Sequence, residues 1–202
     1  YTSGSTGQPK GVMIEHGNCL QTLQATQAAF EVEAGDRLTN LSSQSFDIAV
    51  WELFLPLLNG ATTEIVSQAA VRDTQQLLSI SKKATLFHAV PQVMRSWLTM
   101  IEEEGVAGEY KSLRSLFVGG DVVPESLLRD LKRIFPDAAV YELYGPTENS
   151  ILTSCRPYTD VTYQYSNCIG RPFAHVTSYV LSSSRQPVPL GCVGELYIGG
   201  AG

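Results

Sequence analysis

The first eleven residues carry the hydroxyls, the glycines and the cation that a phosphate-binding loop needs. Ser3, Ser5 and Thr6 supply hydroxyl donors, and Lys10 supplies the positive charge that attracts a polyphosphate. Glycines let a backbone turn several N–H groups toward one anion. The GxxxxGK[ST] pattern fits in no register, so the segment is not a Walker A loop. We interpret it as a phosphate loop of another kind, with a flexible Gly/Ser linker as the alternative.

The residues from Tyr144 to Glu148 form a second candidate for ligand binding. A strand-like run ends there in Gly-Pro, which predicts a turn at the sheet edge where α/β proteins bind ligands. Thr147 is suited to bond a phosphate, Glu148 to hold a hard cation through oxygen, and Tyr144 to present a flat face to a base. Taken alone, an ordinary turn with a solvated glutamate is the better explanation of this segment.

Asp47 is a carboxylate in an apolar setting, preceded by Phe46 and followed by the apolar residues 48–51. A charge in such a setting is not left unpaired. A helix is predicted from there through Leu58, so the residue is suited to be its N-cap.

Gly119, Gly120 and Asp121 follow another predicted strand. Two glycines in such a place let a nucleotide approach the backbone closely. A simple strand-to-helix loop explains Asp121 equally well.

The elements that must position these residues alternate between strands and helices, which indicates an α/β fold. Helices are predicted over residues 16–30 (with Asn18 as a cap), 48–58 after Asp47, a stretch around 77–80, 91–101 after Pro91, and 126–135. Buried, parallel strands are predicted over residues 62–66, 85–90, 116–118 and 139–144. Beyond Gly145 the pattern changes to strands and turns, over 151–155, 176–181 and 195–198. A subdomain boundary is therefore expected between residues 150 and 165.

Composition narrows the functional classes. The chain has 202 residues, of which 44% are hydrophobic and 17% charged, and a formal net charge of −6. A negative balance with scattered bases argues against a nucleic-acid partner. The longest apolar stretch, residues 48–58, is interrupted by Glu52 and is too short to cross a bilayer. The four cysteines form no CxxC pair and no zinc-ligand spacing, which favours free thiols in a cytoplasmic protein.

Four segments together carry a family resemblance. They are TSGSTGQPKG from residue 2, Phe46-Asp47 with Trp51-Glu52, the Tyr144 to Glu148 turn, and GELYIGG from Gly194. In this order they resemble the adenylate-forming (AMP-binding) superfamily, and among its members the adenylation domains of nonribosomal peptide synthetases. The resemblance covers the whole chain and implies an internal fragment of the large N-terminal region, with a layered mixed sheet and flanking helices. It implies an α/β part over residues 1–155, the start of a β-rich subdomain over 156–202, and a C-terminal lid beyond the chain.

The resemblance also assigns a nucleotide site. It implies that Tyr144 stacks on adenine, that Thr147 contacts the α-phosphate, and that Glu148 ligates Mg²⁺ with help from Thr6. Lys10, Thr147 and Glu148 are the implied catalytic residues. The implied nucleotide-binding set is Thr2, Ser3, Gly4, Ser5, Thr6, Gly7, Lys10, Gly120, Glu142, Tyr144, Gly145 and Thr147. Glu142 stands where the family more often has Asn, which weakens the expected contact with the adenine amino group.

An amino-acid pocket is implied in the same way. Asp47 is expected to pair with the α-ammonium of a bound amino acid, a role that activators of fatty or aromatic acids do not need. The implied substrate-binding set is Asp47, Ile48, Trp51, His88, Phe117, Gly119, Leu143, Ile151 and Leu152. The set is similar to serine-activating pockets but departs from them at Gly119 and Leu152, where those usually carry Ser and Asp. Serine or another small amino acid is the expected substrate. For His88, a satisfied core histidine is the alternative.

The implied reaction is the ATP-dependent activation of an amino acid as aminoacyl-AMP, with release of pyrophosphate. Mg²⁺ is the expected cofactor, and the expected partners are a peptidyl carrier domain with its phosphopantetheine arm and a condensation domain. This piece alone is expected to be inactive. The alternatives are an acyl- or aryl-CoA synthetase of the same superfamily and a catalytically inactive nucleotide-binding module. A Ser-His-Asp hydrolase is disfavoured because the sequence contains no GxSxG elbow.

Overall fold

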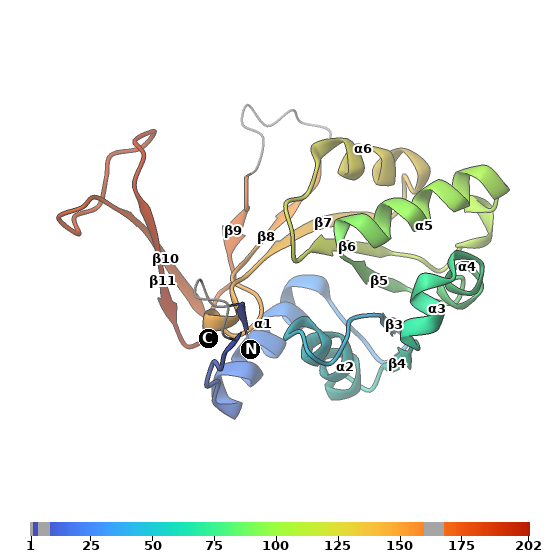
Figure 1. Ribbon diagram of the computed structural model, residues 1–202, viewed down its shortest axis with the longest axis horizontal. Helices are drawn as coiled ribbons and strands as arrows, with labels where there is room; N and C mark the ends of the chain where they lie inside the picture. Colours follow the sequence, from blue (N-terminus) through green and yellow to red (C-terminus); the bar gives the residue numbers. More distant parts are fainter. Residues whose placement is uncertain (1, 4–8, 160–167) are drawn as a thin grey trace.

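A seven-stranded mixed sheet forms the centre of the molecule (Figure 1). The computed structural model describes residues 2–3, 9–159 and 168–202. In spatial order the strands are β4 (Thr62–Ile65), β3 (Arg37–Asn40), β5 (Leu86–Ala89), β6 (Ser115–Gly119), β7 (Ala139–Tyr144), β8 (Ser154–Pro157) and β9 (Arg171–Pro172). The first five are parallel, and β8 and β9 continue the sheet in antiparallel pairing. The predicted mixed sheet with flanking helices is confirmed.

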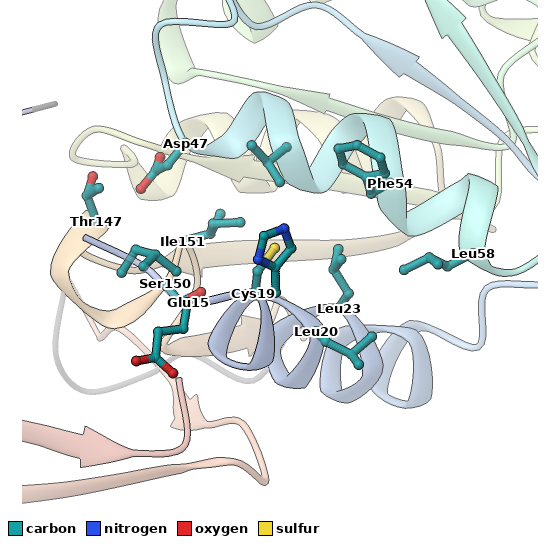
Figure 2. A pocket seen from close by; sticks show the side chains of 13 residues that line it. Glu15, Cys19, Leu20, Leu23, Asp47, Phe54, Leu58, Thr147, Ser150 and Ile151 are labelled. Carbon is teal, nitrogen blue, oxygen red and sulfur yellow. The ribbon is translucent and has the colours of Figure 1, made fainter. Parts of the chain in front are cut away.

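Helices cover both faces of this sheet, because its buried strands carry apolar side chains on both faces. One face carries α3 (Gln68–Arg72), α4 (Thr74–Ser81), α5 (Pro91–Glu104) and α6 (Glu125–Ile134), and the other carries α1 (His16–Phe30) and α2 (Ile48–Leu58). On β5, Phe87 packs with the first group and Leu86 with the second. Successive strand residues point to opposite faces, so each buried strand supplies both cores. Between α1 and α2, Leu20 and Leu23 lie opposite Phe54 and Leu58 (Figure 2).

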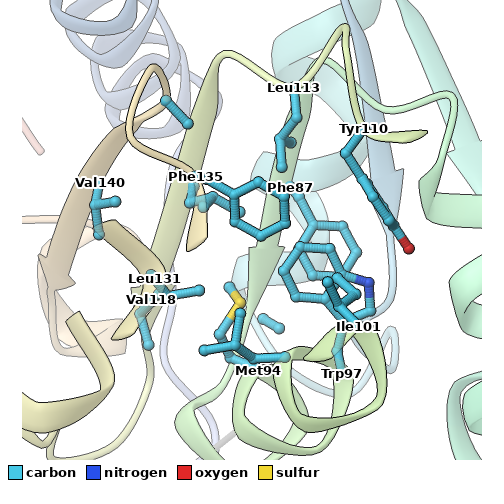
Figure 3. Packing of buried hydrophobic residues seen from close by; sticks show 14 of the residues in the cluster. Phe87, Met94, Trp97, Ile101, Tyr110, Leu113, Val118, Leu131, Phe135 and Val140 are labelled. Atoms are coloured by element: carbon cyan, nitrogen blue, oxygen red, sulfur yellow. The ribbon is translucent and has the colours of Figure 1, made fainter. Parts of the chain in front are cut away.

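The larger core lies beneath α4, α5 and α6 and includes Trp97 (Figure 3). The Trp97 ring stacks on Phe87 at 4.5 Å and on Phe135 at 5.5 Å between ring centroids. Its indole N–H donates to Ser81 Oγ at 2.9 Å, so the buried polar atom is satisfied. This packing fixes β5 and β6, whose carboxyl ends carry the site described below.

Smaller elements complete the chain. They are the short pair β1 (Thr2–Ser3) and β2 (Pro9–Lys10), the 3₁₀ turns η1 (Ala107–Glu109) and η2 (Thr147–Asn149), and the hairpin of β10 (Val176–Leu181) and β11 (Glu195–Gly200). The hairpin is a sheet of its own and extends away from the helices (Figure 1). The expected division after residue 155 falls inside β8, and the large sheet continues to β9 before the hairpin begins. None of the described helices is long and apolar enough to cross a membrane.

Two predicted details of the elements are corrected. The helix over 16–30 has the predicted bounds, but its N-cap is Glu15, and Asn18 instead accepts a hydrogen bond from the Glu15 backbone N–H at 3.0 Å. The strand predicted over 151–155 begins three residues later, at Ser154. Ser150 and Ile151 have φ of 54° and 77°, a left-handed turn that no strand accommodates.

Candidate functional site

A cavity of about 660 Å³ opens at the carboxyl ends of β5, β6 and β7. Ligands of open α/β sheets bind at this edge, and the volume suits a small-molecule ligand. His88 and Val90 enter it from β5 and the residue after it, Gly119 and Gly120 from the end of β6, and Leu143 from β7. The cavity thus lies beside the turns at residues 119–120 and 145–148, where the sequence analysis predicted ligand binding.

Most of the predicted site residues converge on this cavity. Those that line it are Thr2, Asp47, Ile48, His88, Gly119, Gly120, Leu143, Gly145, Thr147, Glu148, Ile151 and Leu152. Those that do not line it are Ser3, Lys10, Trp51, Phe117, Glu142 and Tyr144. Gly4, Ser5, Thr6 and Gly7 lie outside the described residues. Thr2 at the start of the glycine-rich segment and Thr147-Glu148 of the second turn therefore face one shared space.

Asp47 stands immediately before α2 without capping it. Its φ and ψ are −61° and −34°, and its side chain makes no capping hydrogen bond to the described first turn. A capping residue needs extended backbone geometry to swing its oxygen over the first turn, and Asp47 is already helical. The predicted cap is therefore not formed. The carboxylate instead belongs to the wall of the cavity, with Ile48 beside it.

Trp51 and Phe117 form a buried layer behind the cavity wall. Both side chains are fully buried, and their rings meet edge to face at 5.5 Å between centroids. The indole N–H of Trp51 donates to Thr26 Oγ1 of α1 at 3.0 Å. His88 packs against the same indole at 5.9 Å, again edge to face. These aromatic rings support His88 from behind.

Glu52 is a buried polar residue beside the site, and the sequence analysis gave it no role there. It is fully buried on α2, and its carboxylate accepts hydrogen bonds from Asn40 Nδ2 at 3.0 Å and from the backbone N–H and the hydroxyl of Ser42, both at 2.9 Å. Its Oε1 lies 2.7 Å from Nδ1 of His88. The signal in the sequence was an acid interrupting the apolar run 48–58, since a buried acid requires partners.

Strand alternation explains why Glu142 and Tyr144 lie away from the cavity. Leu143 between them faces the cavity, so its neighbours on β7 face the other side of the sheet. Glu142 is buried there against Arg156, whose Nε donates to it at 2.8 Å. Burial raises the pKa of the Glu142 carboxyl, and the hydrogen bond from Arg156 opposes that shift. Arg156 also reaches Glu125 of α6 at 2.8 Å.

The turn that carries Thr147 and Glu148 is held from two directions. Asn149 donates to Thr153 Oγ1 at 2.9 Å, and Thr22 of α1 donates to the carbonyl of Ser150 at 2.9 Å. Among the described residues no cluster of three or more acidic, histidine or cysteine side chains is placed to hold a metal ion. Glu148 alone still fits Mg²⁺, because that ion keeps several waters and takes one or two protein carboxylates together with substrate phosphates.

A second cavity of about 450 Å³ lies between α1 and α2 (Figure 2). Its walls are mostly apolar, and Leu23 and Phe54 are among them. It shares Asp47, Thr147 and Ile151 with the larger cavity. The acid at the start of α2 therefore lies between the two cavities.

Comparison with known proteins places this geometry in a family. A family model described as AMP-binding enzyme matches residues 1–202. Gramicidin S synthase 2 of Aneurinibacillus migulanus is 35% identical over 204 residues, covering 100% of this chain and 4% of that protein. The dimodular nonribosomal peptide synthase of Bacillus subtilis (strain 168) is 36% identical over 204 residues, covering 100% of this chain and 8% of that protein. The chain thus spans a small part of the relatives that it matches.

Solved structures share the fold. The crystal structure of CmiS6 superposes with a TM-score of 0.86 at 28% identity, covering 96% of this chain and 47% of that one. The crystal structure of holo-AB3403, a four-domain nonribosomal peptide synthetase bound to AMP and glycine, superposes with a TM-score of 0.82 at 29% identity. That match covers 96% of this chain and 14% of the synthetase.

Proposed function

Because this chain belongs to the AMP-binding enzyme family and matches part of an adenylation domain of nonribosomal peptide synthetases, we propose that the full-length protein activates an amino acid with ATP. The products would be aminoacyl-AMP and pyrophosphate. The activated residue would then pass to a phosphopantetheine thiol on a carrier domain, with a condensation domain as a further partner. The described cysteines are free thiols, which suits a cytoplasmic protein.

One observation supports this proposal above the others. Asp47, Thr2 and the Thr147-Glu148 turn come from distant parts of the chain and line a single cavity. A carboxylate for an ammonium group and a polar turn for phosphate and metal are then within reach of one bound pair of substrates. An activator of a fatty or aromatic acid has no ammonium to neutralise, so it gains nothing from the charge of Asp47.

In this reaction the residues of the chain mainly align the two substrates and neutralise charge. One carboxylate oxygen of the amino acid attacks the α-phosphorus of ATP, a new C–O–P bond forms, and the bond from the α-phosphorus to the bridging oxygen breaks to release pyrophosphate. Asp47 would orient the amino acid through its ammonium group, and Thr147 would hold an α-phosphate oxygen. Thr2, Lys10 and the intervening segment would hold the β- and γ-phosphates.

The nucleotide base would lie on the face of β7 opposite the amino acid. Tyr144 is half-buried on that face, where its ring is available to stack on adenine. Glu148 would hold Mg²⁺, together with Thr6 of the glycine-rich segment. When bound, the ion offsets the negative charge that builds on the leaving pyrophosphate.

The amino-acid side chain would extend past Ile48 toward His88, Gly119 and Leu143. We propose serine or an amino acid of similar size, because the residues expected around this side chain are similar to those of serine-activating pockets, and six of them line the cavity together with Asp47. Asp47 and His88 are two of the polar residues that line the cavity.

ATP–pyrophosphate exchange by the full-length protein tests the function. We expect exchange to depend on Mg²⁺ and to be stimulated by one or a few amino acids, with no stimulation by the matching des-amino acids. Equal stimulation by des-amino acids would favour an acyl- or aryl-CoA synthetase instead. Failure of the intact protein to bind Mg-ATP would leave an inactive module.

A further inference from the structure

The buried pair of Glu52 and His88 has a defined proton arrangement. Glu52 Oε2 accepts from the amide of Asn40 at 3.0 Å and from the backbone N–H of Ser42 at 2.9 Å, and the Ser42 hydroxyl lies 2.9 Å from Oε1. These two donors fit an ionised Glu52, whose oxygens only accept hydrogen bonds. Opposite an ionised carboxyl, His88 Nδ1 at 2.7 Å from Oε1 carries the hydrogen and donates it.

This arrangement leaves Nε2 of His88 as the ring atom open to a ligand. Nε2 makes no hydrogen bond within the described parts of the chain. It is also not one of the fully enclosed polar atoms without a partner, so part of its surface is accessible. An atom that is neither bonded nor enclosed is open to the space beside it, and His88 lines the larger cavity. Edge-to-face packing on Trp51 keeps the ring from rotating away.

The neighbouring polar side chains of this part of the wall already have protein partners. The Ser42 hydroxyl donates to Glu52, the Ser43 hydroxyl to Ser45 Oγ at 3.3 Å, and the Gln68 amide to the carbonyl of Leu41 at 3.1 Å. Ile48, Leu143 and Leu152 make the rest of that surface apolar. Each of these side chains uses a donor within the protein, whereas Nε2 has no partner among the described residues and is therefore well suited to recognise a substrate side chain.

We propose that Glu52 is a positioning residue that fixes His88 with Nδ1 protonated and Nε2 toward the cavity, so that the cavity selects an amino acid whose side chain carries a hydroxyl. A hydroxyl satisfies Nε2 in either state of the ring, since it donates to the neutral imidazole and accepts from the imidazolium. A methyl group of the same size leaves Nε2 unpaired, which a buried site penalises. This inference rests on the proposed amino-acid activation, narrows the proposed substrates to those with a side-chain hydroxyl, and names the residue that positions His88 for this choice.

The test compares L-serine with its isostere L-2-aminobutyrate in ATP–pyrophosphate exchange by the full-length protein. We expect a kcat/KM ratio of at least about 10 in favour of serine, the factor that one hydrogen bond of ordinary strength supplies. Glu52→Gln places an amide N–H against existing donors and releases the ring, so the ratio should fall by about tenfold. His88→Asn keeps a group facing Glu52 but removes Nε2, and should lower the ratio equally. The matched control Glu103→Gln changes an exposed acid on α5 and should preserve the ratio.

A second readout separates positioning from mere loss of folding. Long-range ¹H–¹⁵N spectra of the ¹⁵N-histidine-labelled protein report which ring nitrogen of His88 carries the hydrogen, with His88→Asn identifying its signals. We expect Nδ1–H in the parent protein and a shifted or mixed pattern in Glu52→Gln. Mg-ATP binding by the variant checks that its site remains folded.

The outcomes are distinct. Equal use of serine and 2-aminobutyrate by the parent protein would overturn the inference and leave amino-acid activation standing. An unchanged ratio with an unchanged ring pattern in Glu52→Gln would remove Glu52 from the positioning role. No exchange with any amino acid would overturn the proposed function and with it the substrate class, while the spectra would still decide whether Glu52 sets the ring.

Discussion

Gly119 and Leu143 face each other in register on β6 and β7, so closely that a β-carbon at position 119 would lie 2.7 Å from the Leu143 carbonyl oxygen. Real β-carbons do not approach a carbonyl oxygen so closely, so any side chain there must push two central strands apart at the cavity. A serine side chain at this position would not fit this arrangement. The absence of a side chain at Gly119 therefore allows β6 and β7 to approach this closely.

We predict that Gly119→Ala lowers kcat/KM for the amino acid by at least about tenfold and destabilises the sheet edge by about 1–3 kcal/mol. The expected readouts are pyrophosphate exchange and faster hydrogen exchange in peptides covering β6 and β7 of the full-length protein. Gly108→Ala is the matched control, because no atom lies within 4 Å of a β-carbon at that position. Equal effects at both glycines would contradict the steric explanation.

Asp47→Asn keeps the size of the side chain and removes its charge. If the carboxylate pairs with the substrate ammonium, KM for the amino acid should rise about tenfold or more, since hydrogen bonds to charged groups contribute about 1.5–3 kcal/mol. KM for ATP should change little. Asp137→Asn removes an exposed charge far along the chain and serves as the control. An unchanged KM for the amino acid would exclude the ammonium contact.

The ion pair of Asp36 and Arg114 gives a pH-dependent contribution to stability. Burial alone would raise the pKa of Asp36, but hydrogen bonds from Arg114 at 2.8 Å and Thr85 at 2.6 Å, with the Glu33 N–H, lower it. A carboxyl whose folded pKa is lowered stabilises the fold above its unfolded pKa of about 3.9. That contribution is lost as the pH falls through the folded value.

Asp36→Asn should therefore reduce stability at neutral pH by about 1–3 kcal/mol and weaken the loss of stability below about pH 4. Hydrogen exchange in peptides spanning β3 and β6, corrected for the intrinsic pH dependence of exchange, measures both effects. Asp137→Asn again provides the control, since its side chain is exposed. An equally steep acid transition in Asp36→Asn would assign the transition to other carboxyls.

The strongly patterned parts of the fold could be predicted from the sequence. The apolar runs of β5, β6 and β7 are buried in the sheet, and the helix after Pro91 shows its buried stripe at Met94, Trp97, Leu98 and Ile101. β3 was missed because its four residues, RLTN, have polar ends and no apolar run. Pairing with β4 on one side and β5 on the other holds it in the sheet, which is tertiary information.

The site was predictable as a set of turns and less so as a set of contacts. Motifs located the residues that converge on the cavity, but the partners of Glu52 come from two other segments, with Asn40 and Ser42 at the end of β3 and His88 on β5. No spacing rule connects those segments before the sheet is assembled. Likewise the register of β7 decides toward which face of the sheet the Glu142 side chain points, and a shift of one residue would turn that side chain toward the cavity.

Trp51→Phe and Trp97→Phe form a matched pair for the buried aromatic layers. Each indole N–H donates to one buried hydroxyl, Thr26 Oγ1 at 3.0 Å and Ser81 Oγ at 2.9 Å, on opposite faces of the same sheet. Each substitution deletes one such bond and part of a ring, so each should destabilise its own face by about 1–3 kcal/mol. Hydrogen exchange in α1 and α2 should respond to the first change, and exchange in α4 and α5 to the second.

The same pair decides whether Trp51 contacts the substrate. The structure places its ring behind the cavity wall, so the preference for serine over 2-aminobutyrate should change no more than about threefold in either variant, less than one hydrogen bond supplies. A larger change in Trp51→Phe that Trp97→Phe does not share would put the indole against the bound amino acid. Both variants lose an indole N–H and part of a ring, so general instability should change the substrate preference of both variants alike. It cannot produce a change in Trp51→Phe alone.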